Sequence, residues 1–304
     1  MRIILFFLLL KSFNTFSQDT LMPNVILDDV IIFSDENGFT VEDFVKNVRT
    51  DTTFYMGFKN LRYYSHNYSS ELLMLDKKGN RIASQKRKGY HFSNGKYAFL
   101  DRDSIYDQHG MLNRSGKYKF YTPEAFDEVF FPSDTLSVDL NISKIPASNE
   151  SKNMRDAKNV MFSIGTDNIE RSSAGLSRKL AIFDLEMQKY YDYVISDTLF
   201  NNYNCYVFEI RLKESLSENE INETLIKKII TYFDKKNLNV LYREYKFKYK
   251  NLLIDLDIFV KVKMDYFFGK HIPVFIYYKG YWDFPLVNRE TAIFRLINTN
   301  FIFN

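Results

Sequence analysis

The residues that could do chemistry in this sequence are few and widely spaced. There are four histidines, none of them in metal-site spacing: His66, His91, His109 and His271. In the run Asp107-Gln108-His109 a carboxylate and an imidazole share one side of a strand, but a metal would need further ligands from elsewhere. A solvated loop is the simpler interpretation of this run, and His271 is also more simply a loop residue than a base.

Motifs of catalysis are missing from the sequence. It contains no G-x-S-x-G elbow, H-E-x-x-H helix, phosphate loop or dinucleotide fingerprint. Asp255 and Asp257 would share one face of a strand and resemble an acid/base pair, but any polar strand face has this spacing. Cys205 has no neighbouring histidine and is interpreted as a small buried hydrophobe. We therefore predict a protein that is not an enzyme and uses no cofactor or metal.

Aromatic residues are the most distinctive content of the chain. They make up 17% of its 304 residues, with 22 Tyr and 29 Phe. Two interpretations stay open: core packing, and an apolar pocket in which tyrosine hydroxyls orient a polar group. For the pocket we predict ligand-binding residues on successive strands of a curved sheet: Tyr245, Phe247, Tyr266, Phe275 and Tyr277.

The elements that would position these residues are mainly strands, because Phe and Tyr favour a half-buried pleated surface. Turn residues separate strand-like runs in the last third of the chain, which indicates an antiparallel meander of about seven strands. The runs are 188–196, 204–213, 225–234, 238–249, 253–266, 272–279 and 291–303.

The first half mixes strands with helices. An opening strand is predicted at 24–33, a helix after the N-cap Thr40, and a second helical segment from Thr53 to Leu61. Hairpin turns are predicted at 77–80 and 93–96. In Thr122-Pro123 the Thr would cap a short helix over 123–130. Arg289 and Glu290 begin the last strand, where we expect them to act structurally as a charge pair.

These patterns together predict an α+β fold, a curved antiparallel sheet in the form of a half-open barrel with short helices packed on one side. The predicted parts are a signal peptide (1–17), a region of strand, helix and hairpins (18–143), a polar loop or seam (144–178) and the meander (179–304). We expect the meander to continue the sheet of the preceding region.

The amino terminus predicts export. Arg2 is followed by an apolar run, Ile3 to Leu10, which is too short to span a bilayer. Cleavage is predicted between Ser17 and Gln18, placing the mature protein in the periplasm or cell envelope. Its net charge would be near +1, which indicates no affinity for nucleic acid. The lone Cys205 excludes an internal disulfide.

Several segments carry a resemblance to known proteins. They include Ile230 to Tyr245, Val262 to Tyr266, Gly269 to Pro273, Gly280 to Pro285, and Leu27 to Ile32 with Phe58 to Arg62. The chain resembles the uncharacterised exported proteins common in Bacteroidota. The strand, Asp-Lys turn, strand rhythm of its last third is similar to the half-open barrel of the periplasmic lipoprotein carriers. That likeness implies that the concave face of the sheet holds acyl chains, and neither group implies a catalytic residue.

The function predicted from the sequence is non-catalytic binding of a hydrophobic ligand, a lipid or lipidated partner, in the cell envelope. Two alternatives stay open: a structural or interaction module of an envelope complex, and a hydrolase whose residues converge only in three dimensions. A large apolar cavity would favour the first function, a flat aromatic patch the second, and a carboxylate or histidine cluster in a cleft the third. The sequence does not indicate an oligomeric state.

Overall fold

The computed structural model describes residues 48, 53–138, 179, 182–252, 254–284 and 287–303. The predicted signal peptide, the Ser17/Gln18 junction, the strand at 24–33 and the polar seam at 144–178 lie outside these residues. So does the helix predicted after Thr40, apart from Val48, which is helical. The predicted part boundaries are not tested by the structure and stay predictions.

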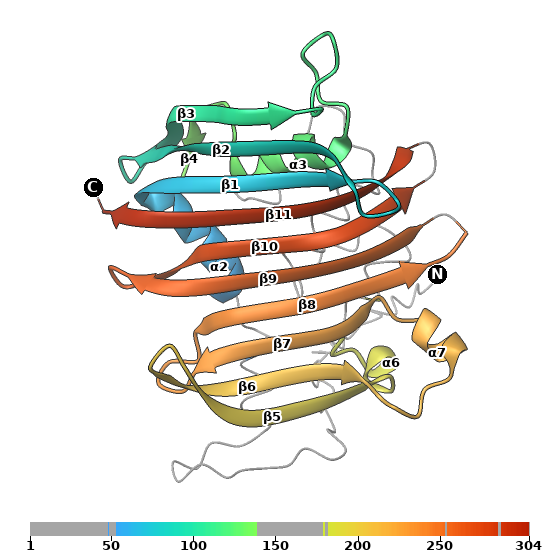
Figure 1. Cartoon of the computed structure of the whole chain (residues 1–304). Coiled ribbons are helices and arrows are strands. Elements are labelled where there is room, and N and C mark those ends of the chain that lie inside the picture. Colours follow the sequence, from blue (N-terminus) through green and yellow to red (C-terminus); the bar gives the residue numbers. More distant parts are fainter. Residues whose placement is uncertain are drawn as a thin grey trace, which may run out of the picture.

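The described residues form one antiparallel sheet of eleven strands. In chain order the strands are β1 (Ser65–Leu75), β2 (Arg81–Ser93), β3 (Tyr97–His109), β4 (Leu136–Ser137), β5 (Tyr191–Phe200), β6 (Tyr203–Leu212), β7 (Ile226–Asp234), β8 (Val240–Lys250), β9 (Asp255–Phe267), β10 (Lys270–Phe284) and β11 (Val287–Ile302). Their order in the sheet is β4-β3-β2-β1-β11-β10-β9-β8-β7-β6-β5. The sheet is curved and does not close, because β4 and β5 are its two edges (Figure 1). The predicted half-open α+β fold is confirmed.

The local strand predictions agree with the structure. The seven runs of the last third correspond to β5 through β11, each paired with its neighbour in the chain. The two predicted hairpin turns join β1 to β2 and β2 to β3. Turn chemistry explains the first of these, because Asp76 accepts hydrogen bonds from the backbone N–H groups of Lys78 and Asn80 at 2.8 Å.

One pairing joins strands that are far apart in the sequence. β1 lies antiparallel to β11, with Leu72 opposite Phe294 and Met74 opposite Ala292. All four of these side chains are buried. The hairpins of the first half and the meander of the second half therefore share one sheet and one hydrophobic layer.

The helices α2 (Thr53–Asn60), α3 (Tyr121–Phe130) and α6 (Leu185–Gln188) lie behind the sheet in the view of Figure 1, whereas α7 (Glu218–Asn222) lies at its rim. A 3-10 turn, η1 (Leu61–Tyr63), continues α2. The helical segment predicted from Thr53 is confirmed. The predicted start of α3 is wrong, because the helix begins at Tyr121 and Thr122 lies inside it. The hydroxyl of Thr122 donates to Glu290 on β11 at 2.6 Å, so it does not cap the helix.

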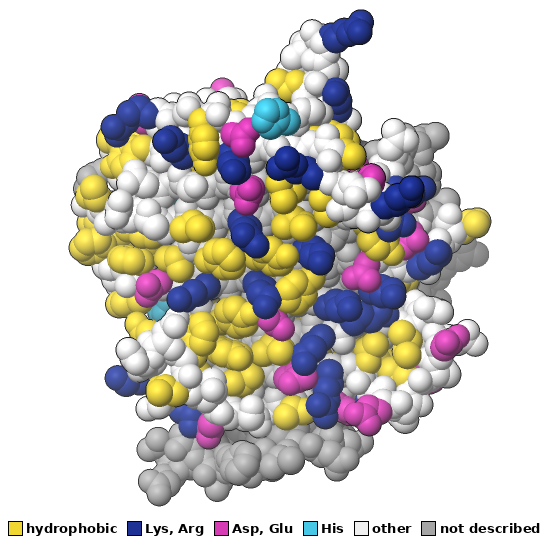
Figure 2. Space-filling view, viewed as in Figure 1, with side chains coloured by type: hydrophobic (Ala, Val, Ile, Leu, Met, Phe, Trp, Pro, Cys, Tyr) yellow, Lys and Arg dark blue, Asp and Glu magenta, His cyan; other side chains and the backbone are white. Residues whose placement is uncertain are grey.

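The two faces of the sheet differ in composition. On the helix side, β1 buries alternate residues from His66 to Met74, and β8 buries Arg243, Tyr245 and Phe247. On the outer face, Lys and Arg alternate with aromatic and aliphatic side chains across the strands (Figure 2). Salt bridges cross this face, for example Lys228 to Glu209 at 2.9 Å. The core therefore lies between the sheet and its helices.

Candidate functional site

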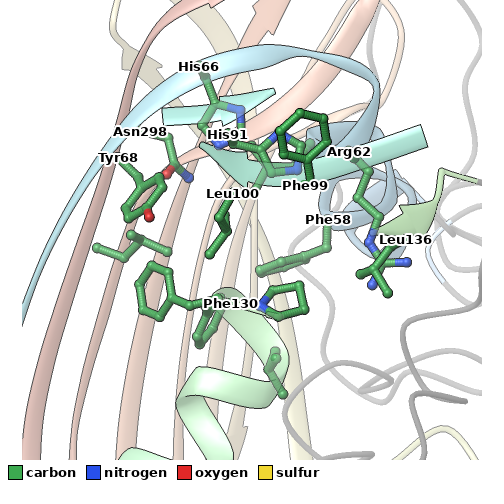
Figure 3. A pocket seen from close by; sticks show the side chains of 16 residues that line it. Phe58, Arg62, His66, Tyr68, His91, Phe99, Leu100, Phe130, Leu136 and Asn298 are labelled. Atoms are coloured by element: carbon green, nitrogen blue, oxygen red, sulfur yellow. The ribbon is translucent and has the colours of Figure 1, made fainter. Parts of the chain in front are cut away.

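A cleft of about 60 Å³ opens between the sheet and the helices α2 and α3 (Figure 3). Most of its wall is apolar: Phe58, Leu61, residues 98–100, residues 129–132, Leu136 and Leu296. Its polar lining consists of Arg62, His66, Tyr68, His91 and Asn298. In Figure 3 the two histidines lie at the sheet side and Phe130 lies on the helix opposite. The cleft thus combines an apolar wall with a polar group, as ligand sites commonly do.

The α2 side of the cleft is fixed by close packing against β9 and β10. Asn60 donates from Nδ2 to the backbone carbonyl of His271 at 3.1 Å. A Cβ at Gly57 would lie 1.9 Å from Cε of Met264, so the glycine permits this close approach. Phe58 and Arg62, which follow directly, are thereby held at the cleft.

The start of α3 is held by one buried carboxylate. Glu290 accepts hydrogen bonds from the backbone N–H of Tyr121 at 2.6 Å and of Thr122 at 2.8 Å. Trp282 donates from its indole to the hydroxyl of Thr122 at 3.0 Å. A carboxylate at a helix N-terminus satisfies unpaired N–H groups and favours the helix dipole. The predicted pairing with Arg289 is not what Glu290 does, because Arg289 is exposed and stacks over Tyr281 at 3.6 Å.

A charge network ties the rest of α3 to β2 and β3. Arg87 donates from Nε to Asp103 at 2.7 Å and from Nη1 to Asp127 at 2.8 Å. Tyr118 donates to Asp127 at 2.5 Å and Tyr68 to Asp103 at 2.6 Å. Burial raises the pKa of Asp127, whereas for Asp103 the hydrogen bonds from Arg87 and Tyr68 outweigh burial and lower the pKa. Every member has a partner, so the network holds α3 in place rather than offering a reactive group.

His66 and His91 form the polar centre of the cleft. They are paired directly across β1 and β2, and their rings stack with centroids 4.6 Å apart. Nδ1 of each ring lies at hydrogen-bond distance from the carbonyl oxygen of Tyr64, 2.9 Å for His66 and 3.1 Å for His91. Burial is the main reason that the pKa of His66 falls to about 3 and that of His91 to about 4. Both rings are therefore neutral at physiological pH.

The five residues predicted to bind a ligand are placed on both sides of the sheet. Tyr245 and Phe247 lie on the buried, helix-side face of β8. Phe275 and Tyr277 lie on the outer face of β10, opposite Lys263 and Lys261 of β9. Tyr266 is exposed at the end of β9, where its ring contacts His271. The cleft is lined by none of the five, and a role for them in binding stays a prediction.

The other candidates from the sequence occupy ordinary structural positions. Asp107 and His109 do lie together at 2.9 Å, but His109 is exposed and the described residues contain no cluster of three metal-ligating side chains. Asp255 accepts from Tyr281 at 3.0 Å and lies 3.3 Å from Lys250. Cys205 is buried in β6, and burial raises its pKa. Among the described residues, no helix is both long enough and apolar enough to cross a bilayer.

The histidine pair could have been found from the sequence. Counting outward from the predicted turn at 77–80 places residue 66 opposite residue 91. In the structure Leu75 pairs with Arg81, and a register shift between Met74 and Leu75 leads to the same His66–His91 pair. The contact between α3 and β11 has no comparable signal in the sequence, because Glu290 and Thr122 are 168 residues apart in the chain.

Comparison with known proteins gives distant structural likeness only. No protein-family model and no curated protein matches the chain. A DUF1329 family protein from Desulfovibrio piger is 14% identical, with a TM-score of 0.27 over 86% of this chain and 93% of that one. An outer membrane lipoprotein-sorting protein domain from Vibrio parahaemolyticus is 10% identical, with a TM-score of 0.26 over 82% of this chain and 91% of that one. A lipovitellin structure is 6% identical, with a TM-score of 0.31 over 79% of this chain and 25% of that one.

With identities and TM-scores this low, the three likenesses support no inference about a shared ligand or activity. Membership of an exported Bacteroidota group stays a prediction.

Proposed function

We propose that this protein binds an amphipathic molecule, a lipid or the acyl chain of a lipidated partner, in the cleft between the curved sheet and α2 and α3. The observation that carries the proposal is the lining of the cleft, in which a largely apolar wall surrounds one polar centre, His66 and His91. Binding would be non-covalent and without catalysis, and would take place in the cell envelope.

The small volume of the cleft limits how much of a ligand can enter it. About 60 Å³ is far below the 300–1,000 Å³ of pockets that enclose a drug-sized molecule. The described cleft would therefore hold the head of a ligand and the first part of its chain. Tyr245 and Phe247 lie on the same face of the sheet but are fully buried in the core, and their contact with a ligand stays a prediction.

The hydrolase alternative is less well supported by the geometry. A histidine in a cleft was the feature expected of it, and two are present. However, a catalytic histidine is normally oriented by a side chain such as a carboxylate and lies beside a nucleophile. Here one backbone carbonyl orients both rings, an arrangement suited to fixed hydrogen-bonding groups.

The direct test is to purify the exported full-length product from its own envelope and to measure bound lipid by native mass spectrometry and solvent extraction. We expect a stoichiometric amphipathic ligand that is released on unfolding. Protein that carries no ligand and also fails to bind added fluorescent acyl probes would contradict the proposal.

A further inference from the structure

The two cleft histidines share one hydrogen-bond acceptor, and this determines where their protons lie. Nδ1 of His66 and Nδ1 of His91 both contact the carbonyl oxygen of Tyr64. A carbonyl oxygen can accept two hydrogen bonds but cannot donate one. Nδ1 of each ring therefore carries the proton.

The second nitrogen of each ring is consequently an acceptor. A neutral imidazole has a single N–H, so Nε2 of His66 and of His91 presents a lone pair. Protonation of Nε2 is opposed by burial and, for His66, by the adjacent His91. For His91, burial and the positive charge of Arg62 act in the same direction.

The Nε2 atoms of the two rings are not engaged by the described part of the protein. Neither has a hydrogen-bond partner among the described residues. The same residues contain one sealed side-chain polar atom that lacks a partner, Nε2 of Gln108, so the histidine nitrogens are not sealed. Since both rings line the cleft (Figure 3), it offers a ligand two adjacent acceptors.

We propose that the cleft selects amphipathic ligands whose head group donates hydrogen bonds, through a hydroxyl or an amide N–H, over the ionised carboxylates of free fatty acids. This inference rests on the proposed function, because it concerns the ligand of the same cleft. A hydroxyl can donate to Nε2, whereas a carboxylate has only acceptor oxygens, which would face the lone pairs of both rings. Arg62, the cation of the cleft, is the group that would favour the opposite choice.

The test compares two probes with the same acyl chain, monolauroylglycerol and laurate, by titration calorimetry of the full chain at neutral pH. One net hydrogen bond changes an affinity by about two- to tenfold. With two acceptors available, we expect monolauroylglycerol to bind roughly tenfold more tightly than laurate.

The decisive variant is His91→Asn, because an asparagine amide can still donate to the carbonyl of Tyr64 but has no group at the position of Nε2. We expect it to weaken monolauroylglycerol binding by about two- to tenfold and to leave laurate binding unchanged or slightly tighter, because one of the two lone pairs that face the carboxylate is removed. His66→Asn is the second variant, for use if the first does not fold. His109→Asn, at the exposed end of β3, should change neither affinity.

The outcomes separate this inference from the proposed function. Laurate binding as tightly as monolauroylglycerol, or more tightly, would overturn the inference alone and assign the head group to Arg62. An unchanged affinity ratio in the folded asparagine variants would also overturn it. If neither probe binds the wild type, both this inference and the proposed function fail.

Discussion

Single buried polar side chains, more than the aromatic clusters, determine how the cleft is built. His91 and Glu290 are each oriented by backbone groups of a segment distant in the chain, whereas His66 contacts the carbonyl of Tyr64, two residues before it. Their burial also makes the stability of the fold depend on pH in a direction that can be worked out.

The histidine pair predicts a loss of stability in mild acid. The unfolded chain binds a proton at each histidine near pH 6.5, but the folded pKa values are about 3 and about 4. The unfolded state therefore binds more protons as the pH falls below about 6.5, and the free energy of unfolding decreases from there towards the folded values. Urea unfolding at several pH values measures this decrease.

His91→Asn removes one of the two titrating groups, so the free energy of unfolding should decrease less steeply with falling pH in this variant than in the wild type. His109→Asn is the matched variant at an exposed site. Burial raises the pKa values of Asp127 and Glu290, so these carboxyl groups make the fold more stable as the pH falls. The contribution of His91 is therefore the difference in pH dependence between the wild type and His91→Asn. The same decrease in wild type and His91→Asn would contradict the prediction.

Glu290 and its neighbour Arg289 make a second prediction. Glu290→Gln replaces a buried carboxylate that accepts two backbone N–H bonds and a hydroxyl bond, and it should lower the free energy of unfolding by about 1.5–3 kcal/mol. Arg289→Ala removes an exposed stacking contact and should cost less than about 1 kcal/mol. Chemical denaturation of both variants tests the contrast, and equal costs would sink the assigned role of Glu290.

At the scale of elements, the close approach of β1 to β2 and β3 depends on one glycine. A Cβ at Gly89 would lie 2.3 Å from the hydroxyl oxygen of Tyr68 and 3.0 Å from Cα of Asp103. Gly89→Ala should therefore displace Tyr68 from Asp103 and cost about 1–3 kcal/mol by overpacking. Lys88→Ala, on the outer face beside it, should be nearly neutral. Thermal denaturation of the pair tests this, and similar melting temperatures would refute it.

The elements were predicted well where the pattern is local. Turn residues and strand-like runs predict β5 through β11 and both hairpins because these features are properties of neighbouring residues. The start of α3 was not predicted, since Thr122-Pro123 satisfies the local rule for a cap while Glu290, distant in the chain, supplies the actual partner. Both faces of β10 carry aromatic residues, and which of them is buried depends on where the helices pack, so the outer position of Phe275 and Tyr277 could not be predicted locally.

At the scale of the whole molecule, the pairing of β1 with β11 makes the two halves of the described chain one unit. Phe294 lies on β11 at this β1–β11 pairing, where it is buried against Phe126 and Phe130 with ring centroid distances of 4.6 and 5.4 Å. Phe294→Ala should cost about 3–5 kcal/mol, whereas Phe303→Ala, which removes an exposed ring, should cost far less.

The β1–β11 pairing also predicts that the described chain unfolds cooperatively. The single Trp282 reports on β10, and circular dichroism reports on the sheet as a whole. If the halves are one unit, both signals should change at the same urea concentration, in the wild type and in Phe294→Ala. Two separate transitions would show that the halves fold independently. No local pattern in the sequence encodes the β1–β11 pairing, which is why the half-open sheet was predictable as a class but this central pairing was not.

The most direct test of the central claim is to fill the cleft and measure ligand binding. Leu100 projects into the cleft from β3 (Figure 3), and Leu100→Trp should occupy most of its small volume. Leu199→Trp, at an exposed position of β5, is the matched control. With a fluorescent acyl probe titrated into each folded variant, we expect Leu100→Trp to lose binding and Leu199→Trp to bind as the wild type does. Unchanged binding by Leu100→Trp would contradict a ligand site in this cleft.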